Sequence, residues 1–596
     1  MKKVRLMNIK TKIALTIIAA LSGSISGCSS TNNLPLEPAL IQQISTTTES
    51  ALFDASSPLL TLSHFQQASA ALGTAEDINS LDKLLYYFRA FSYYGPTDQL
   101  EVADYSELSA ALEQLVNSGQ LNNQARLQEQ YAVMLYRYFS SNERAAQLAP
   151  LLPQLNTQLA QLANTASQQS NDYALLETLK AYGFLFNVTR KDIDGELNTT
   201  LLSAQLNEPL VAFAASPASI RAEKDWPRTN AYWALALYRL SLPSSEDGEA
   251  TALELAVDEA VANIAKQDVA KRGDSAKDAY SKGYHVNTFA AQERCLESSD
   301  ICRIPDLKEA LPIEHHCSDS LFILAQDLNQ QELTESCTKL TSQESHFHQL
   351  LETQQQATAN DNNDALRVVA FKNWSQYHYY GQLVFDIQTD NGGMYIEGTP
   401  SKPGNQATFF AYRQWWIEPD FAIWNLNHEY VHYLDGHFVK YGGFGHFPSK
   451  MVWWSEGLAE YIARGDQNPT TLKIIKRDID KAPSLEDIFA TEYKDGVNMT
   501  YKWSYMAVRF LAEHYHSDYV QLSQFLKTDY FEGYELLLTE LAQHQQQFSD
   551  WLTSQVEQFD DSEEKSKARL HKQNRYAYRD YLQPEHLTQD SKHLHF

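Results

Sequence analysis

Residues 428–432 read His-Glu-Tyr-Val-His, a spacing that favours two imidazoles on one face of a helix. His428 and His432 lie four positions apart, about one helical turn, so both rings can reach the same metal ion. In hydrolytic zinc sites with this spacing, the glutamate after the first histidine activates water. Glu429 occupies that position. The alternative is a pair of packed histidines on a half-buried helix. The acidic segment at residues 453–460 argues against this alternative.

That second segment, residues 453–460, reads Trp-Trp-Ser-Glu-Gly-Leu-Ala-Glu. A hydrolytic zinc site uses three protein ligands and keeps a fourth position open, which makes Glu456 the expected third ligand. Glu460 lies one turn further along the same face, where it can accept the remaining ring N–H of a ligand histidine. A solvated pair of acids is the alternative. The neighbouring tryptophans make the surroundings apolar, however, and unpaired carboxylates are costly there.

Four stretches between about 365 and 510 resemble the microbial collagenase family of gluzincin zinc metallopeptidases. They are Asp-Asn-Gly-Gly-Met-Tyr-Ile-Glu at 390–397, His-Glu-Tyr-Val-His-Tyr-Leu-Asp-Gly at 428–436, Trp-Ser-Glu-Gly-Leu-Ala-Glu at 454–460 and Tyr-Lys-Trp-Ser-Tyr at 501–505. Their order and spacing are also similar to those of the family. The preceding part of the chain has a looser likeness to the family's helical activator domain. The resemblance implies a zinc endopeptidase that hydrolyses collagen-like, gelatin-like or other extracellular peptides.

By position, the resemblance implies one catalytic zinc ion, with Glu429 as general base. The implied zinc ligands are His428, His432 and Glu456. Gly392 and Gly393 match the double glycine that holds substrate backbone at a sheet edge, a role that close backbone approach allows. An Asn-Gly hairpin turn is the alternative interpretation of these glycines.

Two further functional groups are implied only by the resemblance. Tyr501 matches the tyrosine that stabilises the oxyanion, with Tyr505 as the nearby alternative and core packing as the other interpretation of either ring. Glu397 and the Gly436 carbonyl resemble a structural calcium site. The alternative for Glu397 is a solvent-facing strand residue.

The sequence leaves the substrate class open. Collagen degraders of this family commonly carry small β-sandwich modules that grip collagen, and none is recognisable before Phe596, so we expect action on gelatin or shorter peptides rather than on fibres. A gluzincin aminopeptidase is a second hypothesis, although Gly-Gly-Met-Tyr-Ile-Glu lacks the amine-binding glutamate by spacing. A third hypothesis is a catalytically inactive peptide-binding lipoprotein.

The first residues predict export. Five basic residues precede a short apolar run, Ile13 to Leu21, which is too short to span a bilayer and is typical of a signal peptide over residues 1–27. Ile-Ser-Gly-Cys at 25–28 resembles a bacterial lipoprotein box, which implies lipid attachment at Cys28 and sorting to the outer membrane. Plain secretion is the alternative. Residues 28–50 read as a tether.

The net charge indicates which partners are expected. Removal of the five basic residues of the leader changes the net charge from −27 to −32. An acidic surface of this kind argues against nucleic acid or anionic lipid as a partner and favours solubility outside the cell, with the attached lipid as the only expected anchor.

The remaining cysteines fall within 43 residues, and an even, clustered set in an exported protein predicts two disulfides with three connectivities. They are Cys295, Cys302, Cys317 and Cys337. The alternative is a second metal site, since His315 and His316 precede Cys317.

The expected fold is α+β with several domains. Leucine, alanine and glutamine at helical spacing predict an array of helix pairs over residues 51–350. Polar residues 351–364 read as a linker. A catalytic zinc peptidase subdomain is expected over residues 365–480, with strands at 367–370, 382–387 and 408–412 and a zinc helix from Pro419 to Gly436. A helical C-terminal subdomain is expected over residues 481–596.

Overall fold

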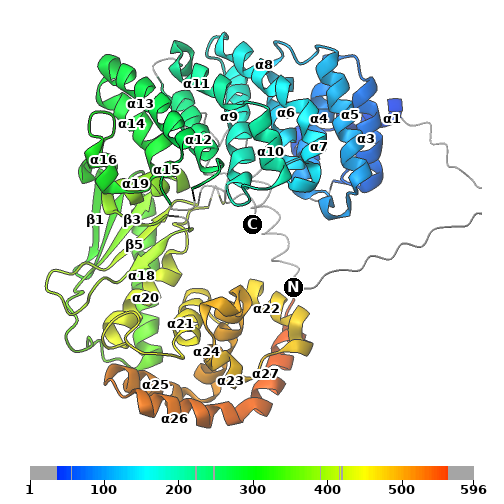
Figure 1. The fold of residues 1–596 in the computed structure, drawn as a ribbon. Helices are drawn as coiled ribbons and strands as arrows, with labels where there is room; N and C mark the ends of the chain where they lie inside the picture. Colours follow the sequence, from blue (N-terminus) through cyan, green and yellow to red (C-terminus); the bar gives the residue numbers. More distant parts are fainter. Residues whose placement is uncertain are drawn as a thin grey trace, which may run out of the picture.

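The computed structural model describes residues 37–54, 57–221, 224–245, 248–389, 391–414, 417 and 420–560. A row of paired helices forms the N-terminal half, a small sheet adjoins it, and a second group of helices completes the C-terminal half (Figure 1). This mostly helical arrangement with one mixed sheet agrees with the expected α+β class. The predicted signal peptide and Cys28 lie outside the described residues.

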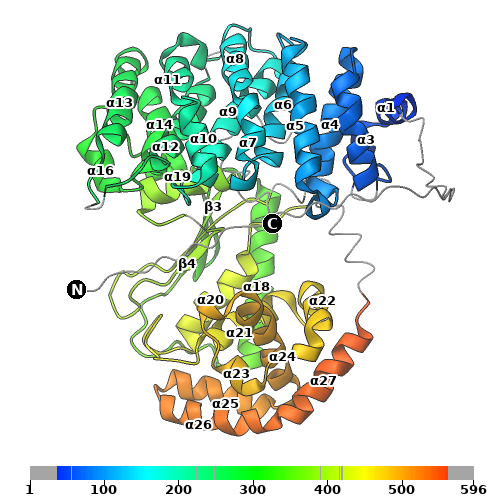
Figure 2. The same ribbon diagram turned by 45° about the vertical axis from the view of Figure 1, so that its right-hand side comes forward.

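The helical array owes its stacking to leucine-rich faces and to a buried polar cluster. Its helices line up side by side along the molecule (Figure 2). Arg89 Nη1 lies 3.0 Å from Glu129 Oε1 and Arg89 Nη2 lies 3.2 Å from Glu177 Oε1, so one guanidinium joins three helices, α4, α6 and α9. The array comprises α1 (Glu37–Thr46), α2 (Glu49–Leu52), α3 (Leu62–Thr74), α4 (Ile78–Tyr94), α5 (Val102–Asn117), α6 (Ala125–Tyr138), α7 (Ala145–Leu148), α8 (Leu152–Ala163), α9 (Gln169–Thr189), α10 (Glu196–Ser203), α11 (Asn207–Ala215), α12 (Trp226–Leu240), α13 (Ala252–Arg272), α14 (Asp274–Tyr280), α15 (Val286–Thr288), α16 (Gln292–Glu297) and α17 (Leu307–Ala310).

The sheet has five strands in the order β1-β2-β3-β5-β4. The inner pairs β2–β3 and β3–β5 are parallel, and the edge strands β1 and β4 are antiparallel to their neighbours. The strands are β1 (Ile313–Ser318), β2 (Leu321–Ala325), β3 (Leu366–Phe371), β4 (Met394–Ile396) and β5 (Thr408–Tyr412). Because β4 is at one end of this order, one of its sides remains available for another strand.

Each face of the sheet packs on a different half of the molecule. Alternate residues of a strand point to opposite faces. Val369, Phe371 and Phe410 belong to the hydrophobic cluster of the helical array. Val368 and Phe409 belong instead to the cluster beneath the C-terminal helices. The sheet is therefore an inner layer between two cores.

The C-terminal half contains ten α-helices and a π-helical turn within the described residues, besides three short 3-10 turns. They are α18 (Gln330–Leu351), α19 (Trp374–Phe385), α20 (Leu426–Phe438), α21 (Val452–Arg464), α22 (Pro469–Asp478), α23 (Leu485–Phe489), the π-helical turn Asn498–Trp503, α24 (Ser504–His514), α25 (His516–Lys527), α26 (Phe531–Leu541) and α27 (Gln545–Gln558). Apolar residues of α20, α21 and α24 share one core with the sheet.

The expected extent of the array, residues 51–350, is wrong at its C-terminal end. Strands β1 and β2 occupy residues 313–325 and pair with the sheet, and α18 packs on α20. The linker predicted at 351–364 is also wrong. Thr358 N donates to the His437 carbonyl at 2.8 Å, and Asp361 Oδ2 lies 2.8 Å from His437 Nδ1. This polar segment is an ordered loop because hydrogen bonds, rather than apolar contacts, hold it.

Two local predictions are also corrected. Residues 382–385 were expected to begin a strand but form the last turn of α19. This helix starts after Asn373, whose side chain accepts from Gln376 N at 3.0 Å. The zinc helix begins at Leu426 and continues to Phe438, so Gly436 lies within it and does not end it. Pro419 lies outside the described residues.

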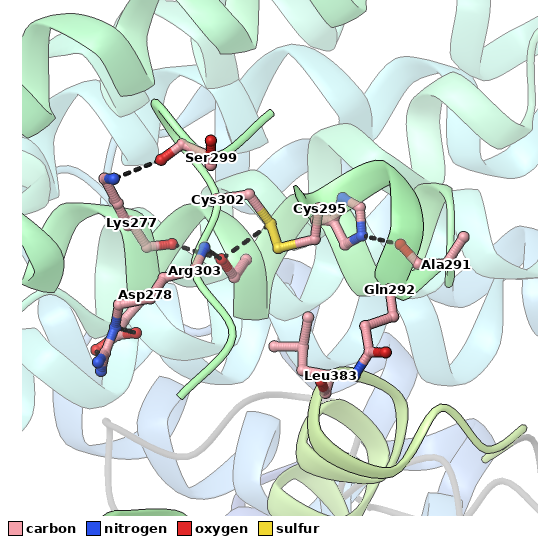
Figure 3. The surroundings of a disulfide bond; sticks show 11 residues. Lys277, Asp278, Ala291, Gln292, Cys295, Ser299, Cys302, Arg303 and Leu383 are labelled. Carbon is pink, nitrogen blue, oxygen red and sulfur yellow. Dashed lines mark hydrogen bonds and ion pairs between the residues drawn. A yellow bond between two sulfur atoms is a disulfide. The ribbon is translucent and has the colours of Figure 1, made fainter. Parts of the chain in front are cut away.

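The four cysteines form two disulfides, Cys295–Cys302 and Cys317–Cys337, as the prediction required. The alternative of a second metal site at these cysteines is therefore wrong. Figure 3 shows the first disulfide beside α19: the Gln292 side chain donates from Nε2 to the Leu383 carbonyl at 2.8 Å. The second disulfide joins β1 to α18 and so fixes the outer strand to the C-terminal half.

Candidate metal centre

Helix α20 carries the two histidines of the predicted site. Asn425 precedes it in the left-handed conformation (φ 54°), and Asn425 Nδ2 donates to Glu429 Oε1 at 2.8 Å. On the core side, Tyr430, Val431 and Leu434 are fully buried. This burial fixes the rotation of the helix and directs its opposite face toward the cleft.

The three expected ligands converge. His428 Nε2 lies 3.1 Å from Glu456 Oε2, and His432 Nε2 lies 3.2 Å from His428 Nε2 and 3.5 Å from Glu456 Oε2. The donor atoms of these residues all lie within 4.8 Å of one another. Two imidazole nitrogens and one carboxylate oxygen form the donor set that hydrolytic zinc prefers. The residues present fit that ion.

The expected partner of a ligand histidine is in place. Glu460 Oε1 lies 3.1 Å from His428 Nδ1. Its other oxygen accepts from Asn468 Nδ2 at 3.3 Å and from Lys502 Nζ at 3.4 Å. Such a carboxylate fixes the tautomer and orientation of a ligand imidazole.

Sequence reasoning missed Tyr493, whose hydroxyl donates to Glu456 Oε1 at 2.7 Å. It also missed Asn425, Asn468 and Lys502. Asn425 lies four residues before Glu429, so helical spacing could have identified it. Tyr493, Asn468 and Lys502 come from a short helical turn, a helix cap and the π-helical turn, and no spacing rule connects them to the histidine motif. For Tyr493, the strongly polar stretch Glu492 to Asn498 was the one signal available, and it does not distinguish a site from a solvated loop.

Two carboxylates with lowered pKa values give the centre the negative charge that favours binding of a cation. Burial opposes a charge on His428, but hydrogen bonds to Glu456 and Glu460 outweigh burial and raise its pKa to about 10. Burial would raise the pKa of Glu460, yet its hydrogen bond to His428 lowers it to about 2. The pKa of Glu456 is also held well below its usual range by the two histidines, against the effect of burial. Two ionised carboxylates thus face the imidazoles.

The centre opens into a cavity of about 900 Å³. Its walls include β4, the Trp424 side chain, Glu429 and Tyr501. A cavity of this size accommodates several residues of an extended peptide. Because β4 is an edge strand, its free side faces the same space.

Gly392 and Gly393 lie at the start of β4 and line this cavity. A Cβ on Gly392 would lie 2.9 Å from Trp424 Cζ2, and one on Gly393 (φ 129°) would lie 2.8 Å from the Phe410 carbonyl oxygen. The hairpin interpretation is wrong, since α19 precedes the glycines and β4 pairs with β5. Both positions require glycine for packing alone, and their exposed backbone borders the cleft.

The structure separates the two candidate tyrosines. Tyr501 lies in the π-helical turn, its ring centroid is 6.0 Å from that of His428, and it lines the cleft. Burial and the nearby Glu456 raise its pKa, so the hydroxyl stays protonated. Tyr505 is fully buried and donates to the Gly465 carbonyl at 2.7 Å. Of the two, only Tyr501 faces the candidate metal centre.

Glu397 does not face solvent, so that alternative is wrong. It is 7% exposed, and burial raises its pKa. A Cβ on Gly436 would lie 2.1 Å from Glu397 Oε1, so the carboxylate lies directly against the backbone of α20. Phe444 N donates to Glu397 Oε2, and Lys440 contributes a nearby positive charge.

Within the described ranges, no helix combines the length and the apolar character needed to cross a bilayer.

Comparison with known proteins gives one family match. Residues 270–551 match the Peptidase_M9 model, described as Collagenase. The microbial collagenase of Vibrio alginolyticus is 42% identical over 239 residues, which are 39% of this chain and 29% of that protein. That of Vibrio vulnificus is 36% identical over 245 residues, 41% of this chain and 30% of that protein. Collagenase ColT of Clostridium tetani is 27% identical over 212 residues, 33% of this chain and 20% of that protein. The matches thus cover less than a third of the length of each of these relatives.

Proposed function

Because the chain belongs, through residues 270–551, to the microbial collagenase family of peptidases, we propose that it is a zinc-dependent endopeptidase. One observation carries the proposal. His428, His432 and Glu456 converge within 4.8 Å beside Glu429, in a cleft bordered by a free strand edge. A donor set for zinc and a surface for polypeptide backbone therefore share one space.

The proposed chemistry divides between the ion and the chain. A zinc ion held by the three ligands supplies Lewis-acid polarisation of the peptide carbonyl and increases the acidity of water. Glu429 takes a proton from the attacking water and returns it to the leaving amine. Its Oε1 is oriented by Asn425, which keeps the carboxylate next to the ligand histidine. Glu460 and Tyr493 hold the ligands His428 and Glu456.

Substrate binding is proposed along β4. A polypeptide in extended form would pair with the free side of this strand, with Gly392 and Gly393 allowing close backbone approach. The Tyr501 hydroxyl donates a hydrogen bond to the carbonyl oxygen of the scissile peptide bond, where negative charge develops during the attack. Gelatin-like or other extracellular peptides are the proposed substrates.

The test is metal analysis combined with peptide hydrolysis. We expect one zinc per chain, and cleavage of gelatin and of a peptide with a blocked N-terminus. Cleavage only of peptides with a free amino group would favour an aminopeptidase, because such an enzyme must bind that amine. Stoichiometric zinc without hydrolysis of any member of a peptide library would favour an inactive binding protein.

Tyr501→Phe is expected to lower kcat by about 100-fold, because removal of one oxyanion donor has an effect of this order. KM should change little, since the hydroxyl acts mainly in the transition state. Tyr505→Phe is the matched control: it removes a buried hydrogen bond and should lower thermal stability without changing kcat. The reverse pattern would assign the oxyanion role to Tyr505.

Tyr493→Phe is expected to weaken zinc binding by about 10- to 100-fold, the usual effect of losing a group that orients a ligand. Competition with a chromophoric chelator measures the change directly. An unchanged zinc affinity would show that the 2.7 Å bond to Glu456 is dispensable.

Two further features belong to this proposal. A structural calcium ion would be held by Glu397 and the Gly436 carbonyl, and the support for it is a buried carboxylate pressed against the α20 backbone. Calcium should then raise the melting temperature of the wild type but not of Glu397→Gln.

Export as an outer-membrane lipoprotein through Cys28 is proposed from the sequence alone, and mass analysis of the N-terminal peptide tests it.

A further inference from the structure

A second cavity, of about 610 Å³, lies where the helical array meets the sheet. One wall comes from α9, α12 and α15, and the other from α19 and the loop 386–389 that follows it. Figure 1 shows α19 directly beneath α12 and α15. We call this space the junction cavity. Its volume is in the range of specific ligand pockets.

The lining of the junction cavity is rich in amide side chains and poor in charge. Asn187, Asn287, Gln382 and Gln388 contribute amides, whereas Arg190 and Asp386 contribute one charge of each sign. The remaining wall is largely apolar and includes Phe184, Trp233, Leu237 and Trp374. Such a lining suits an uncharged ligand with both N–H and carbonyl groups.

Gln382 is held in the wall of the junction cavity by hydrogen bonds to its own helix and to the loop that follows it. Its side chain is only 6% exposed. The Nε2 atom donates to the His378 carbonyl at 2.9 Å and to Thr389 Oγ1 at 3.0 Å. Its Oε1 has no partner in the described part of the chain. Because this oxygen is also closed off from the cavity, Gln382 contributes a fixed wall, and the amides of Asn187 and Gln388 contribute the polar groups available to a ligand.

The junction cavity also adjoins the proposed substrate path. Thr389 lines it, and Gly392, three residues later, lines the cleft at the metal centre. Three residues span at most ~10 Å. Trp374, a wall of the cavity, donates from Nε1 to the Asn391 carbonyl at 3.0 Å, and Asn391 Oδ1 accepts from Gly393 N at 2.9 Å. The same short segment therefore shapes both spaces.

Strand direction decides which part of a substrate would reach the cavity. A polypeptide paired antiparallel with β4 runs opposite to it, so its C-terminal part leaves the strand past Gly392. Residues 386–389 lie on that side in the chain. The loop that ends at Thr389 therefore connects the junction cavity with the end of β4 that the C-terminal part of such a polypeptide would pass.

We propose that the junction cavity binds the polypeptide substrate downstream of the scissile bond. This inference rests on the proposed function, because it extends the same substrate along the chain. The side-chain amides of Asn187 and Gln388, on opposite walls, bind the substrate backbone. Binding there gives long substrates an advantage that does not depend on the residues at the metal centre.

The experiment measures peptide binding without turnover, in the Glu429→Gln background. Fluorescence anisotropy gives the dissociation constant of labelled peptides with one shared central sequence and a short extension, a long downstream extension or a long upstream extension. We expect the downstream extension to tighten binding by about tenfold, which corresponds to ~1.4 kcal/mol. The upstream extension should give no gain that depends on the cavity.

Asn187→Trp fills the cavity from α9 and is expected to abolish the gain from the downstream extension while leaving the short peptide unaffected. Val188→Trp is the matched control, since Val188 lies next to it on the same helix, is 42% exposed and does not line the cavity. Gln388→Trp blocks the opposite, exposed wall and keeps the test decisive if the α9 variant fails to fold.

Equal affinity of the short and downstream-extended peptides would overturn the proposal, as would a full gain in both tryptophan variants. Hydrolysis by the zinc-loaded wild type is measured separately. If no peptide is cleaved but the downstream gain persists and disappears in Asn187→Trp, the proposed function fails while the cavity remains a polypeptide-binding site.

Discussion

Glu429→Gln is expected to lower kcat for a blocked peptide by about 10²- to 10⁴-fold, the usual contribution of a positioned general base. The amide keeps the size of the side chain and can still accept from Asn425 at Oε1, so the cleft should keep its shape. Glu429 is not among the converging donor atoms, and zinc content should therefore stay at one per chain. Metal analysis and steady-state kinetics on the same preparation provide both numbers.

Controls distinguish loss of the base from loss of the site. His432→Ala should lose zinc and activity together, whereas Glu486→Gln on the exposed side of α23 should change neither. If Glu429→Gln cleaves at the wild-type rate with zinc bound, another group removes the proton and the proposed mechanism is wrong. If it loses zinc, the residue supports the metal centre rather than acting as a base.

A fragment comprising residues 365–596 is expected to be insoluble, although it contains every proposed catalytic residue. It lacks β1, β2 and α18, so β3 becomes an open edge and the core loses the apolar residues of α18. On the opposite face of the sheet, α19 remains but loses the helical array on which its outer side packs. Exposed strand edges and apolar faces promote aggregation.

Expression of matched fragments measures this effect. A fragment beginning at residue 305 keeps all five strands and α18, and it should leave a larger soluble fraction than the fragment beginning at 365. The full chain should exceed both. A soluble 365–596 fragment with a cooperative thermal transition and peptide cleavage would show that the sheet does not need its first two strands.

The relative placement of the two histidines, and of the two glutamates, in the candidate metal centre could be predicted from the sequence because each pair lies on one helix. Within a helix, a separation of four residues sets the relative direction of His428 and His432, whatever the rest of the fold does. Glu456 and Glu460 follow the same rule on α21. Tyr493 was not predicted because it is separated from Glu456 by 37 positions in the sequence, and their contact depends on how a loop packs.

The errors in the fold share a different cause. Strand β1 contains His315, His316 and Cys317, which give no clear alternation of apolar residues, so its pairing with β2 was not visible. The polar segment 354–364 has two alanines as its only apolar residues and therefore resembled a linker. Thr358 N donates to the His437 carbonyl, and Asp361 Oδ2 accepts from His437 Nδ1, which keeps the segment in place; composition carries no information on such distant partners.

The position of the sheet between two cores has a thermodynamic consequence. Neighbouring residues on β3, such as Val368 and Val369, belong to opposite cores, so neither core can melt without uncovering the strand that the other one needs. The helical array and the metal centre are therefore coupled in stability even though they are distant in sequence. A destabilising substitution deep in the array should lower the temperature at which the candidate metal centre unfolds, and the two halves should denature as one calorimetric unit.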